Sequence, residues 1–195
     1  MVLGHFKNAF LELLDKRFLK FKLSKEKLLC FKTFCWYCTT SGIQKQVFLL
    51  KGKPVFSYSL NSLINSKLID QVIVVTNKEQ QNEIINYVNG NEKVLVCLGG
   101  ETRQKSVENG LAMIKDANHD DIILIHDGAR PLLDEEIINR VIEAAKIDGA
   151  VTTYLPLEDT IAFNDYNEHI AGFADRTNLV KIQTPQAFKY DIICE

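Results

Sequence analysis

The residues of this chain that are best suited to chemistry lie in two polar loops, each of which follows a short apolar run. Residues 99–106 supply two glycines, an arginine and a serine. Residues 126–131 supply Asp127 and Arg130 beside a turn of small residues. In an α/β protein such loops meet at the carboxyl edge of the sheet, where ligands bind. The pattern therefore indicates a site for a phosphorylated, hydroxyl-rich ligand.

Several of these residues also have a purely structural interpretation, which the sequence leaves open. Asp127 and Arg130 are close enough in sequence to form a local ion pair of small energetic value. The Ser106 hydroxyl is placed to cap a helix that runs to Ile114, and capping is compatible with ligand contact. His126 fits a packed histidine at the end of a strand better than an acid or a base, and Arg103 fits a brace for its loop.

The elements that would position these loops alternate along the chain. Apolar runs predict strands over 71–76, 94–98, 122–125 and 150–155, and the first is continuous, as in a strand buried on both faces. Helical spacing predicts helices over 55–64, 79–88, 106–114 and from Asp134 to a C-cap at Gly149. Alternation of this kind predicts an α/β fold, namely a three-layer, Rossmann-like and mostly parallel sheet.

This alternation breaks at about residue 158. Two apolar runs, 160–163 and 169–173, flank a polar stretch at 164–168. The pattern predicts a β-hairpin that projects from the sheet as an arm over 159–176. An isolated hairpin cannot bury its apolar side chains, so the arm needs a partner surface.

The first 41 residues differ from the remainder in charge, with eight basic and three acidic side chains. They are treated as a separate, basic N-terminal segment, and 42–195 as the main domain. Helical spacing in 6–18 is typical of a solvated basic face over a packed apolar face. Cys35 and Cys38 have the spacing of a metal or redox pair, but no second pair follows, which favours simple thiols.

Composition excludes several functional classes. A net charge of −2 gives no reason to expect nucleic acid as a partner. No uninterrupted apolar stretch approaches the roughly 20 residues of a membrane span. Five cysteines, an odd number, do not form a disulfide framework. A cytoplasmic location without membrane attachment is therefore expected.

Taken together, five ordered motifs resemble those of the 2-C-methyl-D-erythritol 4-phosphate cytidylyltransferases, over about residue 41 to the end of the chain. The motifs occupy 44–54, 99–106, 126–131, 159–160 with 175–176, and 183–186. The sister family of ribitol-5-phosphate cytidylyltransferases is the alternative. Its loop usually carries Ser-Val where this chain has Gly128-Ala129, which favours the erythritol family.

The resemblance implies an enzyme that transfers CMP from CTP to 2-C-methyl-D-erythritol 4-phosphate, with Mg²⁺, in isoprenoid precursor synthesis. It implies a homodimer whose arms clasp each other's subunit. Catalytic roles are implied for Lys45 and Arg130, and a metal-binding role for Asp127. CTP contacts are implied for Gly100, Glu101, Ser106, Asp127 and Ala129. Sugar-phosphate contacts are implied for Asp127, Arg130, Thr160, Arg176 and Thr184.

The chain departs from the family pattern in two places. The family has a glycine-rich loop with an arginine, which wraps the triphosphate, where residues 28–42 of this chain carry no glycine cluster. The family also continues beyond the position of Glu195 with a segment that supplies another lysine. These departures leave a third hypothesis open, in which the chain is a truncated or frameshifted remnant that folds and dimerises without catalysing.

Overall fold

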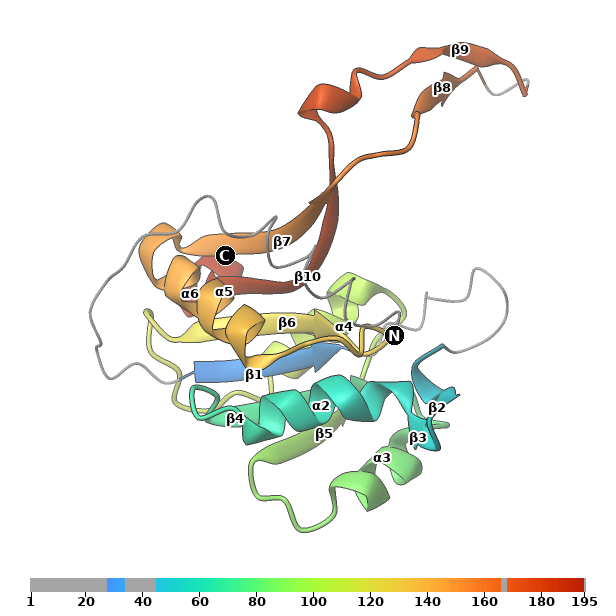
Figure 1. Cartoon of the computed structure of the whole chain (residues 1–195). Coiled ribbons are helices and arrows are strands. Elements are labelled where there is room, and N and C mark those ends of the chain that lie inside the picture. Colours follow the sequence, from blue (N-terminus) through green and yellow to red (C-terminus); the bar gives the residue numbers. More distant parts are fainter. Residues whose placement is uncertain (1–27, 34–44, 166–167, 195) are drawn as a thin grey trace.

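The computed structural model describes residues 28–33, 45–165 and 168–194, and its core is a six-stranded sheet (Figure 1). The strand order is β5-β4-β1-β6-β10-β7. Strands β5, β4, β1 and β6 pair in parallel, whereas β10 is antiparallel to both β6 and β7. The predicted α/β fold is therefore confirmed. The strands are β1 (Leu28–Thr33), β4 (Gln71–Thr76), β5 (Val94–Leu98), β6 (Ile122–Asp127), β7 (Ala150–Pro156) and β10 (Val180–Lys189).

Helices cover both faces of the sheet and form the outer two of the three predicted layers. On one face, α2 (Val55–Asn65), α3 (Gln81–Val88) and α5 (Glu135–Asp148) pack on the sheet. On the other face, α4 (Arg103–Leu111) and α6 (Tyr190–Cys194) pack on it. Alternate residues of β4 and β6 belong to opposite faces, because successive side chains of a strand point in opposite directions.

Two of the six strands are absent from the sequence predictions. Strand β1 lies at the centre of the sheet, between β4 and β6. The sheet therefore begins before residue 42, where the predicted main domain starts. The predicted helix within 6–18 and the Cys35–Cys38 pair lie outside the described residues. The second strand is β10, which returns from the arm to lie between β6 and β7.

Helices α4 and α5 begin at capping residues, and these caps mark where the two polar loops end. Asp134 caps α5, because its carboxylate accepts a hydrogen bond from the backbone N–H of Ile137 at 3.0 Å. Gly149 ends the same helix with a φ of +78°, a conformation that favours glycine. The predicted cap of α4 is wrong. Thr102, not Ser106, accepts from the Lys105 N–H at 3.0 Å, so α4 begins at Arg103 and ends at Leu111.

The arm leaves the body of the molecule between β7 and β10 (Figure 1). Its strands β8 (Ala162–Asn164) and β9 (Ile170–Phe173) form a separate two-stranded sheet, followed by the short helix η2 (Arg176–Asn178). The predicted hairpin is present, with shorter strands. Its apolar side chains are exposed by 59–67% at Phe163, Ile170 and Phe173.

A second small ribbon precedes α2. It comprises the helix η1 (Lys45–Val47) and the paired strands β2 (Leu49–Leu50) and β3 (Lys53–Pro54).

None of the helices in the described part of the chain has the length and apolar character needed to cross a membrane.

Candidate active site

The carboxyl ends of the parallel strands are aligned, so the two polar loops emerge at the same edge of the sheet. Thr76 at the end of β4 pairs with Leu98 at the end of β5. Thr33 at the end of β1 pairs with Asp127 at the end of β6. Because the loop 99–106 follows β5 and the loop 128–131 follows β6, the topology brings both predicted loops to one edge.

Asp127 and Arg130 form the ion pair that their spacing predicts. The Arg130 Nε donates to Asp127 Oδ2 at 3.1 Å, and the Arg130 backbone N–H donates to the Asp127 carbonyl at 3.1 Å. The Arg130 Nη1 donates to Oε1 of Gln183 on β10. The other carboxylate oxygen, Asp127 Oδ1, is buried and accepts no hydrogen bond. The pair is therefore one part of a larger polar cluster.

Thr184 and His126 hold the backbone of this loop. The Thr184 hydroxyl accepts from the Asp127 N–H at 3.1 Å and lies 3.3 Å from His126 Nδ1. The Nε2 of His126 lies 3.0 Å from the carbonyl of Arg130. Since a carbonyl only accepts, the Nε2 carries the proton in this contact. His126 is 1% exposed, in agreement with the prediction of a packed histidine.

The first loop is held against α4 by Ser106. Its hydroxyl accepts from the Gly100 N–H at 3.1 Å and lies 3.0 Å from the Thr102 carbonyl. A Cβ at Gly100 would come within 2.2 Å of the Lys105 side chain, and one at Gly99 within 2.7 Å of the Ser106 Oγ. Both glycines are therefore needed for the loop to lie this close to the helix. The Ser106 hydroxyl is buried and holds the loop, and its contact with a nucleotide stays a prediction.

Arg103 connects the two loops. Its Nη2 donates to Gln186 Oε1 at 3.1 Å and lies 3.9 Å from Asp127 Oδ1. Arg103 therefore braces the first loop, as predicted, and it does so against β6 and β10. Together Arg103 and Arg130 place two guanidinium groups beside one carboxylate, at an edge where a phosphorylated ligand would need positive charge.

The structure brings together some of the predicted site residues and leaves others apart. Asp127, Ala129, Arg130 and Thr184 lie in one cluster. Gly100 and Glu101 lie in the adjoining loop, and Ser106 lies on α4 beside that loop. Lys45 is exposed on η1, directly before the β2–β3 ribbon. Figure 1 shows this ribbon beyond the ends to which β1 and β6 point.

Two predicted residues, Thr160 and Arg176, are exposed in the segment that forms the arm. The arm projects from the body of the chain (Figure 1). Arg176 does not pair with Asp175. Its Nη1 donates to the carbonyl of Glu158 at 2.6 Å instead, and Asp175 accepts from Thr177.

Two contributing residues, Gln183 and Gln186, are missing from the predicted site. Both belong to the 183–186 motif, so the signal was present in the sequence. Their roles depend on β10 lying beside β6, a long-range pairing that no local pattern reveals.

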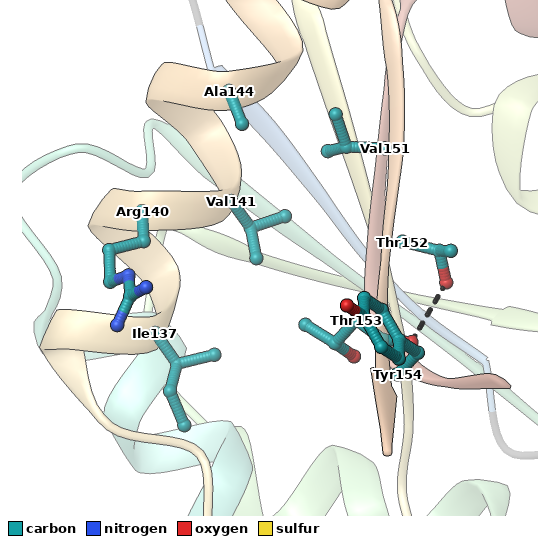
Figure 2. Close-up of a pocket in the computed structure, with 8 residues that line it drawn as sticks. All are labelled: Ile137, Arg140, Val141, Ala144, Val151, Thr152, Thr153 and Tyr154. Carbon is teal, nitrogen blue, oxygen red and sulfur yellow. Dashed lines mark hydrogen bonds between the residues drawn. The ribbon is translucent and has the colours of Figure 1, made fainter. Parts of the chain in front are cut away.

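A small apolar hollow of about 70 Å³ lies elsewhere, between α5 and β7 (Figure 2). Ile137, Val141 and Val151 line it, with Arg140 at its side. None of its lining residues is a predicted site residue. In Figure 2 the side chain of Thr152 points away from α5. Its hydroxyl accepts a hydrogen bond from Gln186 Nε2 at 3.2 Å.

The described residues offer little for other kinds of chemistry. Among them, no group of three or more His, Cys, Asp or Glu side chains is arranged to hold a metal ion. Burial raises the pKa of the Cys97 thiol on β5, which disfavours the nucleophilic thiolate. The arrangement at the carboxyl edge is suited to binding and orienting a charged ligand.

Comparison with known proteins gives a family match. The family model described as "2-C-methyl-D-erythritol 4-phosphate cytidylyltransferase" matches residues 38–195. A relative with that name from Clostridium acetobutylicum is 39% identical over 153 residues, which cover 76% of this chain and 66% of the relative. One from Lachnoclostridium phytofermentans is 40% identical over 158 residues, which cover 80% of this chain and 66% of the relative. The chain thus spans just under two thirds of the length of these relatives.

Comparison with solved structures gives proteins of the same family. A 4-diphosphocytidyl-2C-methyl-D-erythritol synthase from Anaerococcus prevotii superposes with a TM-score of 0.72 and 26% identity, covering 86% of this chain and 71% of that one. A 2-C-methyl-D-erythritol 4-phosphate cytidylyltransferase from Francisella tularensis gives a TM-score of 0.71 and 26% identity, covering 85% of this chain and 74% of that one.

Proposed function

We propose that this chain, which belongs to the 2-C-methyl-D-erythritol 4-phosphate cytidylyltransferase family, transfers CMP from CTP to 2-C-methyl-D-erythritol 4-phosphate. The observation that carries the proposal is the convergence of Asp127, Arg130 and Thr184 with the loop 99–106 at one edge of the sheet. That edge supplies arginine side chains for phosphates, a carboxylate for hydroxyls or a metal, and a glycine loop for a nucleoside.

In the proposed reaction, a phosphate oxygen of the sugar phosphate attacks the α-phosphorus of CTP. A new P–O bond forms, the bond between the α-phosphorus and the oxygen bridging to the β-phosphorus breaks, and pyrophosphate leaves with that electron pair. No protein nucleophile is needed, so catalysis consists of positioning and of stabilising the negative charge of the transition state.

The chain's own side chains have distinct parts in this proposal. Arg130 orients the sugar phosphate, since a guanidinium suits bidentate contact with phosphate. Lys45 places a compact positive charge at the phosphates of CTP. Gly100, Glu101, Ser106 and Ala129 frame the cytidine. Thr184 fixes the Asp127 backbone, as its hydrogen bond to the Asp127 N–H indicates.

The residues present fit a bound Mg²⁺. Mg²⁺ is usually held by one or two carboxylates together with substrate phosphates, so a single carboxylate is sufficient. Asp127 has a buried carboxylate oxygen without a hydrogen-bond donor, which is the kind of group a cation would satisfy. When bound, Mg²⁺ would neutralise charge on the phosphates.

The proposal includes a homodimer. Thr160 and Arg176 belong to the arm segment, and the arm projects from the body of the chain (Figure 1). If the arm lies across a second copy, both residues approach the neighbouring site and can contact the sugar phosphate there. The exposed apolar side chains of the arm support such a contact, because a lone two-stranded hairpin leaves them in water.

Calorimetry with CTP, ATP and GTP tests the nucleotide part of this proposal. We expect CTP to bind in the presence of Mg²⁺ and more tightly than the purine nucleotides. We expect the affinity to be weak, because residues 28–42 contain no glycine cluster to wrap the triphosphate. Equal affinity for the three nucleotides would contradict a site shaped for cytosine.

A further inference from the structure

Two glutamines on β10 each bind one of the arginines that flank Asp127. Oε1 of Gln183 accepts from Nη1 of Arg130. Oε1 of Gln186 accepts from Nη2 of Arg103 at 3.1 Å. The glutamines stand on either side of Thr184-Pro185, where the pairing of β10 with β7 shifts register. One short stretch of β10 thus supplies a hydrogen-bond acceptor to each of the two arginines.

These contacts compete with direct pairing between the arginines and the carboxylate. An arginine beside a carboxylate commonly makes two parallel hydrogen bonds to its two oxygens. Here Arg130 makes only one, from Nε to Asp127 Oδ2 at 3.1 Å, while its Nη1 is bound to Gln183. The Nη2 of Arg103 is held 3.9 Å from Asp127 Oδ1, beyond hydrogen-bond distance, while it donates to Gln186.

The consequence is visible at Asp127 itself. Its Oδ1 atom is buried and accepts no hydrogen bond, although two guanidinium groups lie beside the carboxylate. A buried carboxylate oxygen without a donor is unfavourable, and such atoms in folded proteins call for an explanation. The glutamines provide one, because each occupies a nitrogen that would otherwise satisfy this oxygen.

The orientation of Gln186 is itself determined by the sheet. Its Nε2 donates to the hydroxyl of Thr152 on β7 at 3.2 Å, so its carbonyl oxygen must face Arg103. The Thr152 hydroxyl also lies 3.3 Å from the backbone carbonyl of Gln183. The edge pair β7–β10 therefore supports both glutamines.

We propose that Gln183 and Gln186 are positioning residues that hold Arg130 and Arg103 away from Asp127 Oδ1. This keeps one oxygen of the carboxylate available for a ligand, either a hydroxyl group or a divalent cation. The identity of that ligand rests on the proposed function, but the positioning itself does not.

The direct test is the crystal structure of the double variant Gln183→Leu/Gln186→Leu, in which leucine keeps the bulk and removes the acceptor. We expect a guanidinium nitrogen of Arg130 or Arg103 to move within hydrogen-bond distance of Asp127 Oδ1. Unchanged positions of both arginines would overturn the proposal. If the double variant does not fold, the two single variants provide the same measurement.

Binding supplies a second readout, with Mn²⁺ and CTP as the probe. We expect the double variant to bind Mn²⁺ in the presence of CTP about tenfold more weakly than the unmodified chain. Gln186→Glu added to Gln183→Leu should recover part of this loss, because a carboxylate still accepts from Arg103 and the Thr152 hydroxyl can donate to it. Gln71→Leu is the control. Gln71 lies at the amino end of β4, whereas the candidate site is at the carboxyl edge, so this variant should bind Mn²⁺ with CTP as the unmodified chain does.

The two readouts separate this inference from the proposed function. An unmodified chain that binds no Mn²⁺ with CTP would count against the function, while the arginine positions in the variant structure would still decide the inference. A double variant whose arginines move but whose Mn²⁺ affinity equals that of the unmodified chain would overturn the claim that the freed oxygen serves a ligand.

Discussion

At the scale of single residues, Arg130 is partly exposed to solvent and yet makes hydrogen bonds to two side chains of the candidate site. Its side chain is 40% exposed and binds Asp127 and Gln183. Exposed ion pairs contribute little to stability, whereas a lost charge contact to a transferring phosphate is costly. Arg130 therefore matters more to the proposed reaction than to folding.

We predict that Arg130→Ala lowers kcat/KM for the sugar phosphate by about a hundredfold or more. The free energy of unfolding should change by about 1 kcal/mol or less, as is usual for partly exposed sites. Steady-state kinetics and thermal unfolding of the same preparation measure both quantities. Arg140→Ala is the control, since Arg140 lies on α5, outside the candidate site, and pairs there with Glu136 at 4.0 Å. A large loss of stability with intact turnover would show that Arg130 is structural.

At the scale of elements, the C-terminus of α2 is bound by a lysine from the turn that precedes β5. The Nζ of Lys93 donates to the carbonyls of Ile64 and Ser66, each at 2.8 Å. These are among the carbonyls that a helix leaves without partners at its C-terminus, where positive charge is favourable. Lys93 also precedes β5, so it links the helix to the sheet.

We predict that Lys93→Met destabilises the fold by about 1–2 kcal/mol, because two carbonyls lose a charged donor. For a domain of this size the melting temperature should fall by a few degrees. Nucleotide binding should be unchanged, since Lys93 lies at the amino end of β5 and the candidate site at the carboxyl end. Lys67→Met, an exposed neighbour, is the control. Equal melting temperatures for the two variants would contradict this account.

The base of the arm carries an ion pair that responds to pH. Lys181 Nζ lies 2.6 Å from Asp159 Oδ2, and the lysine lowers the pKa of the Asp159 carboxyl. A lowered pKa in the folded state means that the pair stabilises the arm above the ordinary carboxyl pKa. That contribution is lost as the pH falls through the lowered value.

We predict that NMR titration places the pKa of Asp159 below its ordinary range and that Lys181→Met returns it towards that range. Because both side chains are exposed, high salt should reduce the shift. An Asp159 pKa that is identical with and without Lys181 would show that the pair does not persist in solution.

The elements also show what sequence patterns reveal and what they do not. Strands β4 and β6 were predictable, because each is an apolar run that is buried between helices. Strands β5 and β7 are less buried, but they follow the same alternation with helices along the chain. Strand β10 was not, since Gln183 and Thr184 interrupt its apolar pattern and its partners lie 24 or more residues away in sequence. Thr102 rather than Ser106 caps α4, because both hydroxyls suit a helix start and only the turn geometry decides between them.

The same limit applies to the site. The position of Asp127 and Arg130 at the carboxyl edge of the sheet was predictable, because they stand at the end of an apolar run; their contact with a ligand stays a prediction. The braces Gln183 and Gln186 were not assigned, because their roles exist only once β10 lies beside β6. The assignment of Lys45 and the arm residues stays a prediction.

At the scale of the whole molecule, the arm determines the expected assembly. Phe163, Ile170 and Phe173 are each more than half exposed on a hairpin that leaves the body of the chain (Figure 1). A cluster of exposed apolar side chains of this kind marks an interaction surface. A two-fold arrangement would place two arms in one self-complementary interface.

We predict that light scattering at micromolar concentration gives twice the chain mass of 22.2 kDa. Replacing Phe163, Ile170 and Phe173 by serine should yield monomers, because the interface loses its apolar side chains. Ile147→Ser, at a residue 58% exposed on α5, is the control and should remain dimeric. A monomeric unmodified chain would contradict the arm's assembly role and, with it, the placing of Thr160 and Arg176 in a shared site.

The most direct test of the proposed function is transfer of the cytidylyl group from CTP labelled at its α-phosphorus. We predict that the label appears in a diphosphate-linked product, with release of pyrophosphate, only when Mg²⁺ and 2-C-methyl-D-erythritol 4-phosphate are both present. Ribitol 5-phosphate should be a much poorer acceptor. A folded chain that transfers no label, or that uses ribitol 5-phosphate equally well, would contradict the account.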